Sequence, residues 1–371
     1  MQTDGSNAID NEIISMKNVL SLLFGLALCS ANGIAGEYFS VQKQWEGIDR
    51  EYLIFLPEQY KANENKLFPV VFGLHGYTGT ASGFEKETTK GMNLFAEQEG
   101  IVLVYPQGSH FNSIHQGEPW FISSWNDVVT NADQKPSNPR KCLLDRDEYP
   151  RPPECREFNF CAWTSCYDDL GFLKSILLDV SANYRVDEKR RYMVGMSNGG
   201  AMSYRFSCLY PDLLSASAIV GSTVPISNSC SRETKLPLLI IYGSADSTTP
   251  ADGSPSTDGF VYEPASVLFD SWAENMNCND TAIKSNLKHS EDRGINCIAR
   301  RECELAGKEV QVCEIPGGEH YWPGQNESVG FRSEPLQNDV VNSSSACEKH
   351  YESINWGNEM IWDFLKKHRK G

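Results

Sequence analysis

The chain has 371 residues, of which 40% are hydrophobic and 22% are charged. That is enough apolar sequence for a large buried core, and it argues against disorder over the whole length. The formal net charge is −16, from 33 Lys and Arg against 49 Asp and Glu. Such a surface repels phosphate backbones and the sequence shows no basic stripe, so we expect no nucleic acid among the partners.

Residues 1–35 have the pattern of a secretory signal peptide. A lysine precedes a short apolar run over residues 19–29, and small residues lead to Ala35. The run is shorter than the roughly 20 apolar residues that span a membrane. We therefore expect cleavage after Ala35, no membrane attachment afterwards, and an extracellular or periplasmic protein. Residues before Met16 are acidic, which is wrong for such a signal, so translation is expected to begin at Met16. A lipoprotein anchored at Cys29 is the weaker alternative because a bulky leucine precedes it.

From residue 36 onward, short apolar runs alternate with helical patterns, which indicates a single α/β domain over residues 36–371. Most of the runs are continuously apolar, as expected for parallel strands covered on both faces. Asp168 or Asp169 is the candidate N-cap of the first long helix. The predicted strands cover residues 52–56, 69–74, 101–105, 192–194, 216–220, 238–242 and 310–315. The predicted helices cover residues 170–184, 199–209 and 360–368.

One segment, residues 110–166, interrupts this alternation. It is polar, rich in proline and contains four cysteines, which predicts a disulfide-stapled insertion or lid. A four-cysteine zinc site is the weaker alternative, because the spacing lacks paired knuckles. The chain has twelve cysteines, and export favours disulfides, with Cys208 and Cys230 as one candidate pair. An odd number remains after Ala35, so at least one cysteine is expected to stay free or to pair outside the chain.

The segment Gly195-Met196-Ser197-Asn198-Gly199 follows a predicted strand and opens a predicted helix. In that context, G-x-S-x-G predicts a sharp turn that lifts a nucleophilic serine out of the sheet. Because a serine hydroxyl is a poor nucleophile at its ordinary pKa, it needs a base and an orienting acid.

His320 is the predicted base, because it lies on a glycine-rich loop just after the last strand. His289, His350 and His368 are predicted to be surface residues, and two others, His110 and His115, fall in the insertion.

Asp246 is the predicted acid, because it follows a strand and stands between Ser197 and His320 in chain order. The backbone N–H groups of Tyr77 and Asn198 are the predicted oxyanion donors. A plain capping role for Asp246 and a plain strand-ending turn at His75-Gly76 are the alternatives.

These motifs, in order, resemble the secreted esterase family that contains poly(3-hydroxybutyrate) depolymerases and feruloyl esterases. The resemblance runs from about Tyr52 to Phe364 and implies an α/β-hydrolase fold with Ser197, Asp246 and His320 as the triad. The sequence departs from the family where Glu319 replaces the usual glycine before the histidine, and where the insertion is longer. The motifs that carry it are Gly73-Leu74-His75-Gly76, Trp125-Asn126, Asp168-Asp169-Leu170-Gly171-Phe172, Gly195 to Gly200, Gly243 with Asp246 and Pro250, and Gly318 to Gly324.

The expected function is a serine esterase that hydrolyses carboxylic esters through an acyl-enzyme, without metal or organic cofactor. A hydroxycinnamate ester on plant polysaccharide is the preferred substrate, and a short-chain polyester is the alternative. Acetylxylan esterase, serine peptidase and inactive binding module are weaker readings. His75, Trp125 and Trp322 are candidates for substrate contact, and Trp120 with Phe121 could extend an apolar platform. Packing of the tryptophans against the body is the alternative.

Overall fold

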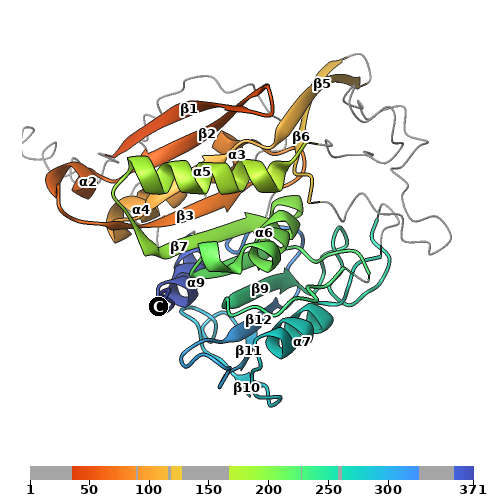
Figure 1. Ribbon diagram of the computed structural model, residues 1–371. Coiled ribbons are helices and arrows are strands. Elements are labelled where there is room, and N and C mark those ends of the chain that lie inside the picture. The colour runs from red at the N-terminus through yellow and green to blue at the C-terminus, as the bar shows by residue number, and fades with distance from the viewer. Residues whose placement is uncertain are drawn as a thin grey trace, which may run out of the picture.

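The computed structural model places most of the chain in one α/β sheet assembly (Figure 1). The predicted signal peptide and residues 128–166 of the predicted insertion lie outside the described residues. The structure describes residues 36–88, 91–115, 118–127, 167–226, 228–257, 261–325 and 355–371.

The described strands form a ten-stranded sheet and a separate two-stranded hairpin. The sheet order is β1-β2-β4-β3-β7-β8-β9-β12-β11-β10, and it is parallel from β4 through β12. This mostly parallel sheet, with antiparallel strands at both edges, is the predicted α/β-hydrolase arrangement. The strands are β1 (Glu37–Trp45), β2 (Ile48–Leu56), β3 (Phe68–Leu74), β4 (Val102–Pro106), β5 (Ser109–His115), β6 (Glu118–Ser124), β7 (Val186–Met196), β8 (Ala216–Val220), β9 (Leu238–Gly243), β10 (Ile283–Lys284), β11 (Asn296–Arg300) and β12 (Val310–Ile315).

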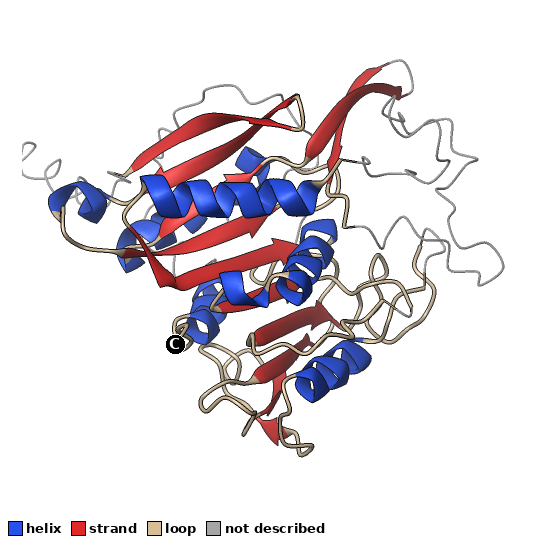
Figure 2. Ribbon diagram, in the orientation of Figure 1, coloured by secondary structure: helices blue, strands red, loops and turns tan. Residues whose placement is uncertain are grey.

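Helices cover both faces of the sheet, as predicted (Figure 2). Side chains of α5, α6 and α7 share one buried cluster with one face of the strands, and those of α3, α4 and α9 share a second cluster with the other face. The helices are α2 (Glu58–Ala62), α3 (Ala81–Glu87), α4 (Met92–Glu99), α5 (Asp169–Asn183), α6 (Asn198–Leu209), α7 (Ala265–Asn275) and α9 (Trp356–Leu365), with a 3-10 turn at Pro211–Leu213.

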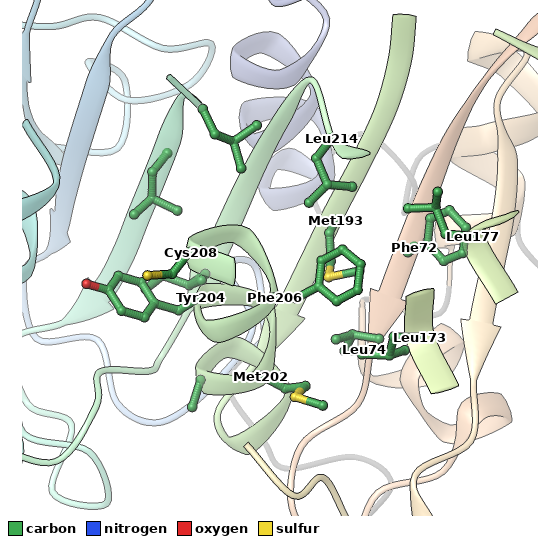
Figure 3. Close-up of a cluster of buried hydrophobic side chains, with 14 of the residues drawn as sticks. Phe72, Leu74, Leu173, Leu177, Met193, Met202, Tyr204, Phe206, Cys208 and Leu214 are labelled. Carbon is green, nitrogen blue, oxygen red and sulfur yellow. The ribbon is translucent and has the colours of Figure 1, made fainter. Parts of the chain in front are cut away.

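The helix that follows the serine motif, α6, is held on the sheet by large apolar side chains. Met202 and Phe206 of α6 are fully buried in the same cluster as Met193 of β7 and Leu173 of α5 (Figure 3). Burying each such side chain stabilises the fold by about 1.5–3 kcal/mol. The start of α6 is therefore held rigidly at the C-terminal end of β7.

The seven predicted strands are all present, as β2, β3, β4, β7, β8, β9 and β12. The edge strands β1, β10 and β11 and the helices α2, α3, α4 and α7 were not predicted. Part of the predicted insertion is regular, since β5 and β6 pair antiparallel over their whole length. These two strands were not predicted, because their short alternating sequences are followed by polar, proline-rich residues. The prediction that His368 is a surface residue is wrong: its side chain is 2% exposed, because the C-terminal segment packs on the sheet and Tyr192 Oη donates to the His368 carbonyl. His289 is partly buried against Glu359, and His350 lies outside the described residues.

Disulfides link cysteines of the C-terminal half. The predicted pair Cys208–Cys230 is confirmed and joins the end of α6 to the segment before β9. Two further bridges, Cys278–Cys303 and Cys297–Cys313, secure the β11 and β12 region. The four cysteines of the predicted insertion lie outside the described residues. Such bridges are typical of proteins folded in an oxidising compartment.

A buried carboxyl on α3 makes stability depend on pH. Burial raises the pKa of Glu87 to about 8. The unfolded carboxyl loses its proton near its ordinary pKa, whereas the folded one keeps it, so stability falls as pH rises from about 4.5 to about 8. Glu87→Gln should therefore be more stable than the wild type at pH 8, by about 4 kcal/mol, and within about 1 kcal/mol of it at pH 5. Urea unfolding at both values measures this, with exposed Glu64→Gln as the control. An equal effect at both values would contradict the prediction.

Candidate active site

Ser197 sits at the sharp turn between β7 and α6. Its backbone has φ of 54° and ψ of −124°, a conformation that strains any residue with a Cβ. The flanking glycines are sterically required: a Cβ on Gly195 would lie 2.2 Å from the Gly199 carbonyl oxygen, and one on Gly199 would lie 2.3 Å from that of Leu74. The G-x-S-x-G motif is thus explained by close backbone contacts around the serine.

The strain at Ser197 predicts a stability difference between two inactive variants. Ser197→Gly should be more stable than Ser197→Ala by about 1 kcal/mol, because relief of strain exceeds the larger entropy that glycine loses on folding. Urea midpoints measure the difference. Ser40 in the extended strand β1 is the control, since there glycine should be less stable than alanine. A lower midpoint for Ser197→Gly than for Ser197→Ala would show that the turn is not strained.

The structure brings His320 and Asp246 together beside the same strand end as Ser197. His320 Nδ1 donates to Asp246 Oδ2 at 2.8 Å. Ser197 N donates to the Val220 carbonyl oxygen at 2.9 Å, and a Cβ built on the next residue, Gly221, would lie 3.5 Å from His320 Nδ1. Serine, histidine and aspartate therefore converge at the C-terminal end of β8.

Asp246 is buried and held by several donors. Its Oδ1 accepts from Thr248 N and Thr249 N, both at 2.9 Å. Burial acts to raise the pKa of Asp246, but the hydrogen bond and charge of His320, together with the Thr249 donors, outweigh it and keep the pKa below its ordinary value. The carboxylate is thus ionised and oriented toward the imidazole, with His320 Nε2 left as the nitrogen that can take a proton.

Thr249 is a member of this arrangement that sequence reasoning missed. Its hydroxyl lies 2.8 Å from the Gly221 carbonyl oxygen, 3.0 Å from Asp246 Oδ2 and 3.3 Å from His320 Nδ1. It therefore links the aspartate loop to the end of β8. Its position three residues after Asp246 in a turn was the available signal, because such residues return to the carboxylate.

The turn after β3, which was expected to supply an oxyanion donor, lies against the serine. A Cβ on Gly76 would be 3.3 Å from Ser197 Cβ and 3.9 Å from its Oγ. Thr78 N donates to the Ser123 carbonyl oxygen at 2.7 Å, which ties the turn to β6. Asn198 is the first residue of α6, so its N–H lies at a helix N-terminus, where negative charge is stabilised. Tyr77 thus follows the glycine that contacts Ser197, and Asn198 follows Ser197 itself.

His75 was predicted to contact the substrate, but its side chain is fully buried. Nδ1 bonds the Gly76 carbonyl oxygen at 2.8 Å, and Nε2 accepts from Gly108 N at 3.0 Å. Burial lowers the pKa of His75 to about 4, and Arg50 adds to that effect. A neutral imidazole with both nitrogens engaged braces the turn and offers no surface to a substrate.

Trp125 and Trp322 are also buried, with 0% and 1% of their surfaces exposed. Both therefore pack against the body of the protein, which was the alternative to substrate contact. Trp125 Nε1 donates to the His75 carbonyl oxygen at 2.9 Å, and its backbone N and O bond the Asn198 side chain. Trp322 Nε1 donates to Asn358 of α9 and anchors the histidine loop. Indole rings bury readily when the N–H has a partner. The side chains of His110, His115, Trp120 and Phe121 lie outside the described residues.

A buried ion pair supports this region and was not anticipated. Arg50 Nη2 donates to Asp169 Oδ1 at 2.7 Å, and Asp169 Oδ2 accepts from Asn126 N at 2.8 Å. The neighbouring Asp168 is the N-cap of α5, accepting from Gly171 N. The sequence pattern predicted only a capping role for these two aspartates, although Asn126 and Asp169 both lie in motifs that this chain shares with the esterase family. The pair holds the Trp125 segment in place.

In the described residues, no group of three or more His, Cys, Asp or Glu side chains could hold a metal ion. No described helix is long and apolar enough to cross a membrane.

The chain is similar in sequence to known esterases, although no family model matches it. It is 26% identical to "Putative esterase NocK" of Nocardia uniformis subsp. tsuyamanensis over 69% of this chain and 66% of that protein. It is 27% identical to "Feruloyl esterase B" of Piromyces equi over 41% of this chain and 29% of that protein. It is 22% identical to "Probable feruloyl esterase C" of Aspergillus oryzae over 74% of this chain and 80% of that protein. The chain thus spans just under two thirds of the first relative and less than a third of the second.

Proposed function

We propose that this chain, which belongs to the α/β-hydrolase esterases that include feruloyl esterases, is a secreted serine esterase acting on hydroxycinnamate esters of polysaccharide. The observation that carries the proposal is the 2.8 Å bond between His320 and a buried, ionised Asp246, beside the strained turn that presents Ser197. Together these groups form the nucleophile, base and orienting acid of an acyl-transfer site.

In the proposed reaction, Ser197 Oγ attacks the ester carbonyl while His320 Nε2 takes the hydroxyl proton. The carbonyl oxygen becomes an oxyanion, which the N–H groups of Tyr77 and Asn198 stabilise. His320 then gives the proton to the departing alcohol, leaving Ser197 acylated. Water repeats the sequence, again with His320 as base, and releases the acid. The chemistry needs no metal or organic cofactor.

Three disulfides in the described residues support export. The similarity to two feruloyl esterases supports a ferulate-type acyl group. The signal peptide of residues 1–35, the single domain of residues 36–371 and closure of the insertion as a lid remain predictions.

The proposal is tested by offering the purified protein methyl ferulate and a 3-hydroxybutyrate trimer together, with products identified by mass spectrometry. Dominant ferulate release is expected. Dominant trimer cleavage would replace the substrate with a polyester and keep the chemistry. A fluorophosphonate probe that failed to label Ser197 would overturn the serine mechanism itself.

A further inference from the structure

The residue that follows β6 bonds the start of the helix that carries one of the two oxyanion donors. Trp125 comes directly after β6, and its side chain is fully buried. Trp125 N donates to Asn198 Oδ1 at 2.7 Å, and Asn198 Nδ2 donates to the Trp125 carbonyl oxygen at 3.1 Å. Two bonds in opposite directions leave the carboxamide one orientation, so they fix the first residue of α6.

The indole of the same tryptophan reaches the segment that carries the other donor. Trp125 Nε1 donates to the His75 carbonyl oxygen at 2.9 Å, and the centroids of the two rings lie 5.0 Å apart. His75 stands two residues before Tyr77, in the turn whose Gly76 contacts Ser197. Trp125 therefore bonds the turn after β3 with its side chain and the start of α6 with its backbone. These bonds couple the positions of the two donor segments.

The segment that contains Trp125 is itself fixed from the start of α5. The N–H of the next residue, Asn126, donates to Asp169 Oδ2 at 2.8 Å, and Asn126 Nδ2 donates to the Tyr167 carbonyl oxygen at 2.9 Å. Asp169 is buried and paired with Arg50. Donors that are held in place before the reaction cost no reorganisation when charge develops on the substrate oxygen. The anchored segment is therefore suited to hold such donors.

We propose that Trp125 and the side chain of Asn198 are positioning residues for the oxyanion: they hold the N–H groups of Tyr77 and Asn198 at the spacing that the tetrahedral intermediate requires. The inference rests on the proposed function, which assigns the oxyanion to those two N–H groups. It gives Trp125 a role in the transition state although its buried ring contacts no substrate.

Two variants test the role with p-nitrophenyl acetate, an ester that does not depend on the ferulate assignment. Trp125→Phe removes the indole N–H and keeps an aromatic ring, and Asn198→Ala removes both bonds to the Trp125 backbone. Each should lower kcat about tenfold to a hundredfold and leave KM within about threefold of the wild-type value, because a displaced donor weakens binding of the transition state and not of the ester.

The controls lose equivalent buried bonds away from the site. Trp272 of α7 is fully buried and its Nε1 donates to the Leu236 carbonyl oxygen at 2.8 Å, so Trp272→Phe matches Trp125→Phe. Asn93 of α4 is buried and accepts a hydrogen bond from a tyrosine hydroxyl, so Asn93→Ala matches Asn198→Ala. Both controls should keep the wild-type kcat, even where their melting temperatures fall as much as those of the test variants.

Inhibition by a trifluoromethyl ketone reports on the oxyanion donors directly. Ser197 Oγ adds to the ketone carbon, His320 takes the hydroxyl proton, and the former carbonyl oxygen becomes an anion while no leaving group departs. The inhibition constant should rise in both test variants by the factor by which kcat/KM falls, and it should stay unchanged in the controls. An unchanged inhibition constant in the test variants, or an equal loss of kcat in the controls, would overturn the proposal.

Hydrogen–deuterium exchange separates this proposal from the proposed function, because it is measured on the resting protein. It follows the N–H groups of Thr78 and Gly79, both of which are bonded to backbone carbonyl oxygens. Their exchange should be severalfold faster in Trp125→Phe than in the wild type and in Trp272→Phe. Faster exchange supports the link between Trp125 and the donor turn even if the protein releases no ferulate. Unchanged exchange overturns that link even if ferulate is released.

Discussion

Ser197→Ala is expected to lower kcat for methyl ferulate by roughly 10⁴- to 10⁶-fold, the range seen when a catalytic serine is removed. The substitution removes the attacking oxygen and leaves the backbone, including the bond from Ser197 N to Val220, in place. The His320–Asp246 pair does not depend on the hydroxyl, so the fold and substrate affinity should be retained. Stopped assays with methyl ferulate, together with circular dichroism, measure the two effects.

Ser40→Ala is a suitable control for Ser197→Ala, since Ser40 is an exposed serine on the edge strand β1. It should retain full activity. If Ser197→Ala kept more than about a hundredth of the wild-type kcat, Ser197 would not be the nucleophile and the acyl-enzyme would be excluded.

Asp246→Asn is expected to lower kcat by about 10⁴-fold with little change in fold. Oδ1 accepts from two backbone N–H groups, so the oxygen of an asparagine would keep that position. The amide nitrogen would then replace Oδ2 and donate toward His320 Nδ1. The imidazole would be forced into the tautomer that carries its proton on Nε2, and it could not accept the proton of Ser197.

The pH profile separates this effect from simple loss of structure. In the variant, activity is expected to recover at high pH, where hydroxide can replace the missing base, while the wild type should reach a plateau. Thr249→Val is the comparison, because it removes a hydroxyl near the same carboxylate and keeps the charge. It should cost far less than Asp246→Asn, and an equal loss would show that the position of the loop, rather than the tautomer, is what Asp246 controls.

Much of the fold was predictable because its evidence is local. Continuous apolar runs become strands covered on both faces, and the runs over residues 69–74, 192–194 and 238–242 lie within β3, β7 and β9. The antiparallel hairpin of β5 and β6 was missed, since its mixed polar and apolar residues lie beside a proline-rich segment.

The roles of the aromatic residues were less predictable than the elements. His75, Trp125 and Trp322 occur in motifs next to the site, and their types suit substrate contact, yet all three are buried. Whether such a side chain faces a ligand or the core depends on partners far away in sequence, such as Gly108 for His75 and Asn358 for Trp322.

The sequence by itself determined the parallel strands of the sheet, the serine turn and the order of Ser197, Asp246 and His320, because strand patterns and the steric needs of a tight turn act over a few neighbouring residues. The tertiary structure alone decided that His320 meets Asp246 at 2.8 Å across 74 positions, and that Arg50 and Asp169 form a buried pair. These features depend on where separate loops come together at the sheet edge, which is set by the packing of whole elements and is not encoded in any short segment.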